Sequence, residues 1–294
     1  MTPMTSGVSS SVPLASGLTL LQFPPSAPLR PFVQCFWQLR GGATAGQAER
    51  ELLHPDGGMG WWFNLGGPVE RDGEPFGGRC WIDGPQLSTA RLTVGGDFDL
   101  LGVRFLPGAG YAVMGEELAA LVGPSMIPGD ALRHLALASL QQRLREAPDL
   151  PRRIALLERR LLAAVRRGVA RHPALPASLA WLQQRHGQGA IEALVAQLPI
   201  GQRRLERLFK RHVGLSPKQY ARMLRIEHGR ALIKRGQGRT PLTDTALEAG
   251  YCDQAHFIHD FKAVTGLTPG AYRRHVQRRE GERGAAAPLG GPQP

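Results

Sequence analysis

A repeat inside the C-terminal half constrains the fold of this 294-residue chain more than any other feature. The segment FKRHVGLSP at 209–217 reappears as FKAVTGLTP at 261–269, and Phe, Lys, Gly, Leu and Pro match at a constant offset of 52 residues. Extending the comparison backward pairs Leu205 with Phe257. One supersecondary unit is therefore expected to occur twice.

Each copy is predicted to be a helix, a short turn and a second helix. In the second copy we expect a helix over 243–249, with Gly250 as its left-handed cap and Asp253 as the N-cap of the next helix. The small Ala246 would let the two helices approach closely, as a helix-turn-helix requires. The residues expected to build the two units are Leu205, Phe209, Gly214, Pro217, Ala246, Gly250, Asp253, Phe257, Phe261, Gly266 and Pro269.

In the first copy the pattern predicts a supporting helix over 191–198, a turn at 199–201 and a second helix over 202–212. Residues 217–235 read as one long helix, because Pro217 suits a first helical turn and apolar residues recur behind it. A rigid connecting helix would hold the two second helices at the spacing of successive major-groove segments, about 34 Å apart.

Residues from about 180 to 278 resemble the tandem helix-turn-helix domain of the AraC/XylS family of transcription regulators. The motifs that carry the resemblance are LERLFK at 205–210, GLSP at 214–217, ALEAGYCDQAHF at 246–257, FK at 261–262, GLTP at 266–269 and YR at 272–273. The first unit departs from the family pattern at Val195, Pro199 and Gly201, where Ala, Gly and a Ser or Thr cap are usual. A glycine cap costs only about a few tenths of a kcal/mol, so the departures affect the docking angle and not the fold.

Charge points to the same half of the chain. The formal net charge is +12, yet residues 1–130 carry 7 Lys and Arg against 12 Asp and Glu, whereas residues 131–294 carry 29 against 12. A basic half joined to an acidic one suggests a polyanion-binding module attached to another domain, although a solvated basic surface would give the same numbers. The repeat narrows the polyanion to duplex DNA.

Residues on the two second helices are expected to contact DNA. Arginine binds guanine, glutamate accepts from cytosine, glutamine suits adenine and alanine meets the thymine methyl group. The candidates for base contact are Arg203, Glu206, Arg207, Gln254, Ala255, His256 and His259. The candidates for phosphate contact, which position without specifying sequence, are Gln202, Arg204, Lys210, Arg211, Lys218, Arg222, Arg239, Lys262, Arg273 and Arg274. A zinc site at His256, His259 and Cys252 is the weaker interpretation of those residues, and neither a metal nor a cofactor is expected.

The predicted fold class is α+β multidomain, with a β-rich, cupin-like sandwich or barrel before an all-α domain. We expect a loose lead-in at 1–30, a β-rich sensor or dimerisation domain at 31–130 and a helical connector with linker at 131–177. The tandem helix-turn-helix domain would follow at 178–279 and a disordered tail at 280–294. The helical stripes at 131–171 would cover the β domain, bridge the two domains or pair two subunits.

The N-terminal half also carries a weaker resemblance. HPDGG at 54–58, WFNLG at 62–66 and LGVRFLPG at 101–108 are similar to an uncharacterised β-rich domain often found before this DNA-binding module. The resemblance implies a cupin-like sensor and specifies no ligand. The candidates for ligand contact are Trp61, Trp62, Trp81, Asp56 and Arg104. Core packing of the tryptophans, and a structural turn or salt bridge for the charged pair, are the alternatives.

The chain is thus expected to be a DNA-binding transcription regulator and not an enzyme. Its expected partners are double-stranded promoter DNA, a small-molecule effector, a second copy of the chain and, for an activator, RNA polymerase. One alternative is a DNA-repair-type fusion with a reactive Cys35 or Cys80; another is an architectural protein that binds DNA without sequence preference. With no long apolar run, no signal peptide and three unclustered cysteines, we expect a cytoplasmic protein with no membrane partner.

Overall fold

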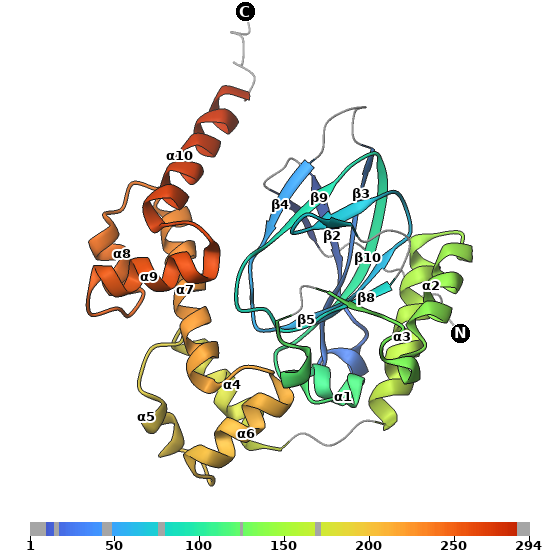
Figure 1. Ribbon diagram of the computed structural model, residues 1–294, viewed down its shortest axis with the longest axis horizontal. Coiled ribbons are helices and arrows are strands. Elements are labelled where there is room, and N and C mark those ends of the chain that lie inside the picture. Colours follow the sequence, from blue (N-terminus) through green and yellow to red (C-terminus); the bar gives the residue numbers. More distant parts are fainter. Residues whose placement is uncertain are drawn as a thin grey trace, which may run out of the picture.

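The computed structural model describes residues 10–14, 18–42, 49–75, 80–123, 126–167 and 172–286. It has a β-sandwich flanked by helices at the N-terminal side and a helical C-terminal domain, which lie side by side (Figure 1). The α+β architecture predicted from the sequence is confirmed.

The sandwich consists of a seven-stranded and a four-stranded antiparallel sheet. In spatial order, the large sheet is β1 (Ser10–Pro13), β2 (Thr19–Phe23), β3 (Val33–Gly42), β10 (Asp97–Phe105), β5 (Met59–Asn64), β8 (Cys80–Asp83) and β11 (Ile127–Pro128). The small sheet is β4 (Glu49–Leu53), β9 (Ala90–Val94), β6 (Val69–Arg71) and β7 (Glu74–Pro75). The segment expected to be a loose lead-in therefore contributes two strands, and Leu20 pairs with Leu39 in the sheet.

Both faces of the large sheet are buried. One face packs against the small sheet and the other is covered by α1 (Gly110–Met114), α2 (Leu137–Glu146) and α3 (Leu150–Arg167). Successive residues of a strand point to opposite faces, so on β5 Trp61 joins the core under the helices and Trp62 joins the core between the sheets. Three short 3-10 helices complete this side: η1 (Ala27–Leu29), η2 (Leu118–Leu121) and η3 (Arg133–Leu135).

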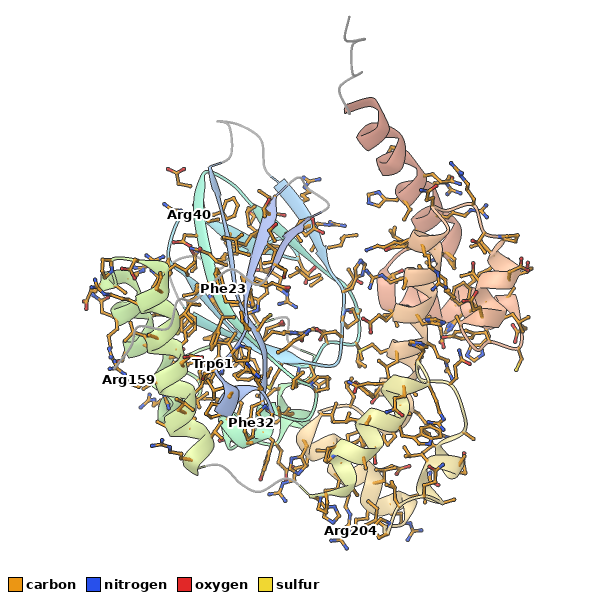
Figure 2. All side chains as sticks on the ribbon, turned by 180° about the vertical axis from the view of Figure 1, so that it is seen from behind. Phe23, Phe32, Arg40, Trp61, Arg159 and Arg204 are labelled. Atoms are coloured by element: carbon orange, nitrogen blue, oxygen red, sulfur yellow. The ribbon has the colours of Figure 1, made fainter. Side chains whose placement is uncertain are left out.

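The helices expected to be a connector belong to the N-terminal domain. Leu140, Leu157 and Leu161 are buried against the large sheet, which selects sheet covering among the three roles expected for this segment. An ion pair also joins these helices to the sheet, because Arg153 Nη1 on α3 lies 2.8 Å from Asp99 Oδ2 on β10. Arg159 instead lies on the outer side of α3, away from the C-terminal helices (Figure 2).

The C-terminal domain has seven helices among the described residues: α4 (Ala174–Gln184), α5 (Ile191–Val195), α6 (Gln202–His212), α7 (Pro217–Arg235), α8 (Leu242–Glu248), α9 (Gln254–Thr265) and α10 (Pro269–Ala286). α4 begins inside the segment expected to be a linker. Pro176 does not prevent this helix, because it falls in the first turn, where proline is tolerated. α10 continues to Ala286, beyond the expected start of the disordered tail at 280. Residues 287–294 of that tail lie outside the described residues.

Candidate nucleic-acid interface

The second helix-turn-helix unit is α8 and α9. Gly250 adopts φ +83° after α8, and Asp253 Oδ1 accepts the backbone N–H of His256 at 2.7 Å, as predicted for a turn glycine and an N-cap. Phe257 and Phe261 are fully buried with ring centroids 5.4 Å apart. The turn and the aromatic core together fix the orientation of α9 relative to α8.

The first unit is α5 and α6. Its supporting helix ends at Val195, earlier than the predicted 198, and α6 begins after Gly201, which has no side chain to cap it. Leu205 and Phe209 are fully buried, and Gly214 takes φ +84° after the helix. The first unit therefore has the same core positions as the second and a weaker cap.

α7 joins the two units as one continuous helix. Ser216 and Gln219 form a reciprocal capping box at its start, with Pro217 in the first turn. Its 19 residues span about 28 Å at 1.5 Å per residue. Tyr220 belongs to the core of the first unit and Ile233 to the core of the second, so both units are built on one rod.

Most candidates for base contact reach solvent. Arg203 and Arg207 on α6, and Ala255, His256 and His259 on α9, are exposed. Glu206 and Gln254 are half-buried, and the Gln202 Nε2 group donates to Glu206 Oε1 at 3.0 Å. Among the described residues, nothing therefore covers the faces of the two second helices that are expected to meet DNA.

A buried carboxylate that the sequence analysis missed lies behind the two histidines of α9. Asp260 is 3% exposed; its oxygens lie 3.3 Å from His256 Nε2 and 3.6 Å from His259 Nδ1, and Oδ2 accepts the Tyr251 hydroxyl at 3.1 Å. Arg222 Nη1, from α7, lies 3.6 Å from the same carboxylate. The signal in the sequence was the spacing of four between His256 and Asp260, which puts both on one helix face.

The phosphate candidates differ in their exposure and in the contacts that they make. The exposed candidates are Gln202, Arg204, Lys210, Arg211, Lys218, Arg239, Lys262 and Arg274, whereas Arg222 and Arg273 are half-buried. Arg211 is engaged by the N-terminal domain: its guanidinium lies 4.9 Å from the Tyr111 ring centroid, donates to the Tyr111 hydroxyl, and has Nε 3.6 Å from Glu117 Oε1. Figure 2 shows Arg204 at the outer end of the same helix.

The N-terminal domain touches both units and the rod between them. The rings of Tyr111 and His212 lie 4.5 Å apart, edge to face, at the end of α6. At the other unit, the backbone N–H of Thr89 donates to the Val264 carbonyl at 2.8 Å, and its hydroxyl donates to the same oxygen at 3.0 Å. Between them, Gly57 lies against the Tyr220 ring of α7.

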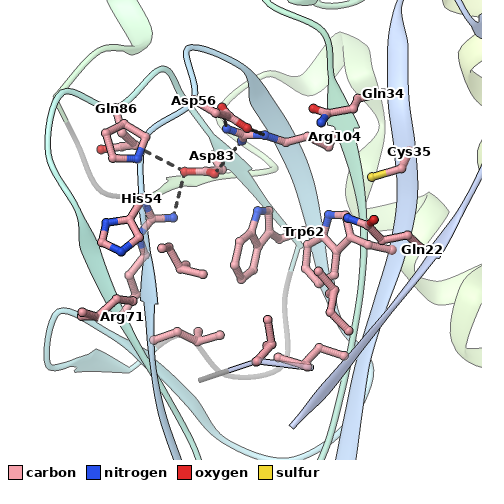
Figure 3. Close-up of a pocket in the computed structure, with 18 residues that line it drawn as sticks. Gln22, Gln34, Cys35, His54, Asp56, Trp62, Arg71, Asp83, Gln86 and Arg104 are labelled. Carbon is pink, nitrogen blue, oxygen red and sulfur yellow. Dashed lines mark hydrogen bonds and ion pairs between the residues drawn. The ribbon is translucent and has the colours of Figure 1, made fainter. Parts of the chain in front are cut away.

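A cavity of about 280 Å³ opens between the two sheets of the sandwich (Figure 3). Of the five candidates for ligand contact, Trp62, Asp56 and Arg104 line it, whereas Trp61 and Trp81 are not among its lining residues. The fully buried Trp61 donates its indole N–H to Met114 Sδ at 3.2 Å in the core under the helices. Trp37, whose ring centroid lies 4.7 Å from that of Trp62, lines the cavity with it.

Four charged side chains alternate at one end of the cavity (Figure 3). Asp83 accepts from Arg71 Nη1 at 2.8 Å and from Arg104 Nη1 at 3.2 Å, and Arg104 Nε donates to Asp56 Oδ2 at 3.0 Å. Burial alone would raise the pKa of Asp56, but the charge and hydrogen bonds of Arg104 hold that pKa below its ordinary value. Arg71 and Asp83 were missed by the sequence analysis, because they come from different sheets and meet only when the two sheets pack face to face.

The structure bears on two of the weaker interpretations, a reactive cysteine and a zinc site. Cys35 and Cys80 are buried, and desolvation raises the pKa of the Cys35 thiol to about 11, which disfavours the thiolate that a transfer reaction needs. Among the described residues, no three His, Cys, Asp or Glu side chains come together as a metal site. Within the same ranges no helix is both long and apolar enough to cross a membrane.

Comparison with known proteins separates the chain into two matched regions. Residues 194–275 match a family described as "Helix-turn-helix domain", and residues 21–126 match one described as "Domain of unknown function (DUF6597)". An uncharacterized HTH-type transcriptional regulator of Haemophilus influenzae is 33% identical over 100 residues, which are 34% of this chain and 33% of that protein. The HTH-type transcriptional activator RhaS of Salmonella schwarzengrund is 27% identical over 156 residues, 52% of each chain. The matched part spans a third to a half of these curated relatives.

Similar solved structures include a probable AraC family transcriptional regulator from Rhodopseudomonas palustris, at 26% identity and a TM-score of 0.33, covering 36% of this chain and 99% of that one. ToxT from Vibrio cholerae covers 78% of this chain and 98% of its own, at 9% identity and a TM-score of 0.43. The tandem helix-turn-helix units, their family match and the regulators that share them lead to one assignment. Residues 194–275 form a helix-turn-helix domain, and this part of the chain is similar to the corresponding part of AraC-type transcription regulators.

Proposed function

We propose that this regulator binds promoter DNA sequence-specifically, with α6 and α9 in two successive major-groove segments. The observation that carries the proposal is the pair of exposed second helices on the single rod α7. The rod is about 28 Å long, of the same order as the roughly 34 Å between groove segments on one face of B-DNA.

The candidate side chains of α6 and α9 are assigned to bases by their chemistry. Arg203 and Arg207 present guanidinium groups that pair with guanine, and Glu206 accepts from the cytosine amino group. On α9, Gln254 suits adenine and Ala255 suits a thymine methyl group, while His256 and His259 stand beside them as further base or phosphate contacts. Glutamate repels phosphate, so its presence on α6 favours base reading over sequence-independent binding.

The N-terminal domain is proposed to respond to an effector and to alter how the two units are presented. Its loop 54–58 supports this role, because Asp56 lines the cavity while the adjacent Gly57 contacts α7. A ligand that shifts the Asp56–Arg104 pair therefore acts next to α7, the rod that sets the distance between the two recognition helices α6 and α9. A homodimer would place two such domains on one promoter, and activation would add RNA polymerase as a partner.

The test is selection of bound sites from random duplexes, followed by affinity measurements on the selected site and on scrambled DNA. We expect two conserved blocks about one helical turn apart, with Arg203→Ala relaxing the choice of base in one block and Gln254→Ala in the other. Arg159→Ala, at an exposed arginine on the far side of the sandwich, is the matched control. Equal affinity for selected and scrambled DNA would instead identify an architectural protein without sequence preference.

A further inference from the structure

We propose that the cavity between the two sheets binds a compact, uncharged, largely apolar molecule that offers one hydrogen-bond acceptor, such as a carbonyl, to Arg71. This inference deepens the effector role and rests on the proposed function for its regulatory meaning. Binding itself is a property of the N-terminal domain and can be measured without DNA.

The walls of the cavity suit an apolar, flat ligand. Its lining includes the indoles of Trp37 and Trp62 and the side chains of Leu20, Leu39 and Leu92. A cavity of about 280 Å³ lies just below the usual range of small-molecule sites, about 300–1,000 Å³, which corresponds to a ligand of one or two rings.

The Arg71 side chain supplies the polar recognition element. It is 2% exposed and lines the cavity; Nη1 donates to Asp83 Oδ1 at 2.8 Å and approaches Met126 Sδ at 2.9 Å. Its Nε is buried and has no hydrogen-bond partner in the described part of the chain. A buried N–H donor without an acceptor costs folding free energy. An acceptor on a ligand in this cavity would give the Arg71 Nε–H group the partner that it lacks.

The charge balance of the site selects an uncharged ligand. Arg71 and Arg104 already share Asp83, and Arg104 also pairs with Asp56, so two cations face two anions. A carboxylate ligand would add a buried negative charge to a neutral set and would have to lose its hydration, whereas an uncharged acceptor adds none. The site therefore prefers an ester, ketone or amide over the corresponding acid.

Equilibrium dialysis of the full-length protein against methyl 2-naphthoate and against 2-naphthoate tests the inference, since the two probes differ in the charge of one group. We expect one saturable site for the ester and at least tenfold weaker binding of the anion. Leu20→Trp, which adds bulk to the cavity wall from β2 and leaves the four charged residues unchanged, should weaken ester binding at least tenfold, and Arg71→Met should also weaken it. Arg159→Ala should leave it unchanged.

Equal or tighter binding of the anion, no saturable binding of the ester, or ester binding that survives Leu20→Trp would each overturn the inference. If Arg71→Met does not fold, as judged by circular dichroism, the probe pair and Leu20→Trp decide alone. The affinity of the same preparations for selected DNA, measured without probe, reports separately on the proposed function. If the wild-type protein shows no saturable ester binding but still binds selected DNA specifically, the ligand class is refuted and the proposed regulator function stands.

Discussion

Gly57, at the tip of a turn in the β domain, lies directly against the Tyr220 ring of α7, 163 positions further along the sequence. Its φ of +74° is a conformation that favours glycine, and a Cβ there would overlap the ring and approach the Met223 methyl group within 2.8 Å. Asp56, one residue earlier, is paired with Arg104 in the cavity. The contact joins the cavity to the rod that spaces the recognition helices.

Gly57→Ala should loosen this contact. The backbone strain and the overlap with Tyr220 together should lower the free energy of unfolding by about 1–3 kcal/mol, measured by urea denaturation. Gly73→Ala is the matched control, because Gly73 also has a positive φ, of +87°, but has open space around its Cβ position. Equal losses in the two variants would mean that the Tyr220 contact contributes nothing.

The sequence predicted the C-terminal domain well because its signals are local. Turn glycines, caps and the 52-residue repeat lie within a few residues of the element they define, and the predicted bounds of α6 and α7 match those observed. The docking of the two domains rests on pairs such as Gly57 with Tyr220 and Thr89 with Val264, which no local pattern encodes.

The tryptophans show that the alternation of side chains along a strand does not by itself tell which face of the sheet meets the cavity. Trp61 and Trp62 must point to opposite faces of β5, so only one could face the cavity. Every residue of β5 is buried, which removes the polar alternation that would have told the two faces apart. Arg71 was missed for a related reason: it sits on a short strand of the other sheet and meets Asp83 only across the sandwich.

The caps of the two recognition helices should respond in opposite directions to substitution. Asp253→Ala removes the acceptor for the His256 N–H and should cost about 0.5–2 kcal/mol of stability. Gly201→Ser should add about a few tenths of a kcal/mol, because Gly201 already has extended φ and ψ and no atom lies near its Cβ position. Thermal unfolding measures both; a stabilising Asp253→Ala or a strongly destabilising Gly201→Ser would contradict the capping assignments.

The salt dependence of DNA binding should distinguish two arginines of α6. Arg204 is exposed, so Arg204→Ala should reduce the slope of log K against log salt by about one if its guanidinium neutralises a phosphate. Arg211 is held by Tyr111 and Glu117, so Arg211→Ala should leave the slope unchanged. A slope that falls equally in both variants would show that Arg211 leaves Tyr111 when DNA binds.

His54 should make the stability of the domain contact depend on pH. Its Nδ1 lies 2.7 Å from Thr89 Oγ1, whose residue bonds Val264, and its ring centroid lies 6.3 Å from that of Tyr272. Burial, together with the nearby Arg230 and Lys234, lowers the pKa of His54 from 6.5 to about 3. The folded protein therefore keeps His54 neutral across the physiological range.

The sign of the effect follows from that depressed pKa. Below about pH 6.5 the unfolded chain binds a proton that the folded chain refuses, so this contribution to stability is complete above pH 6.5 and is lost as pH falls toward 3. Urea denaturation from pH 7 to pH 4 should show a steeper loss in the wild type than in His54→Gln, which retains a hydrogen-bonding side chain. His134→Gln, at an exposed histidine outside the domain contact, should follow the wild type. Parallel curves for the wild type and His54→Gln would show that His54 titrates alike in the folded and unfolded chains.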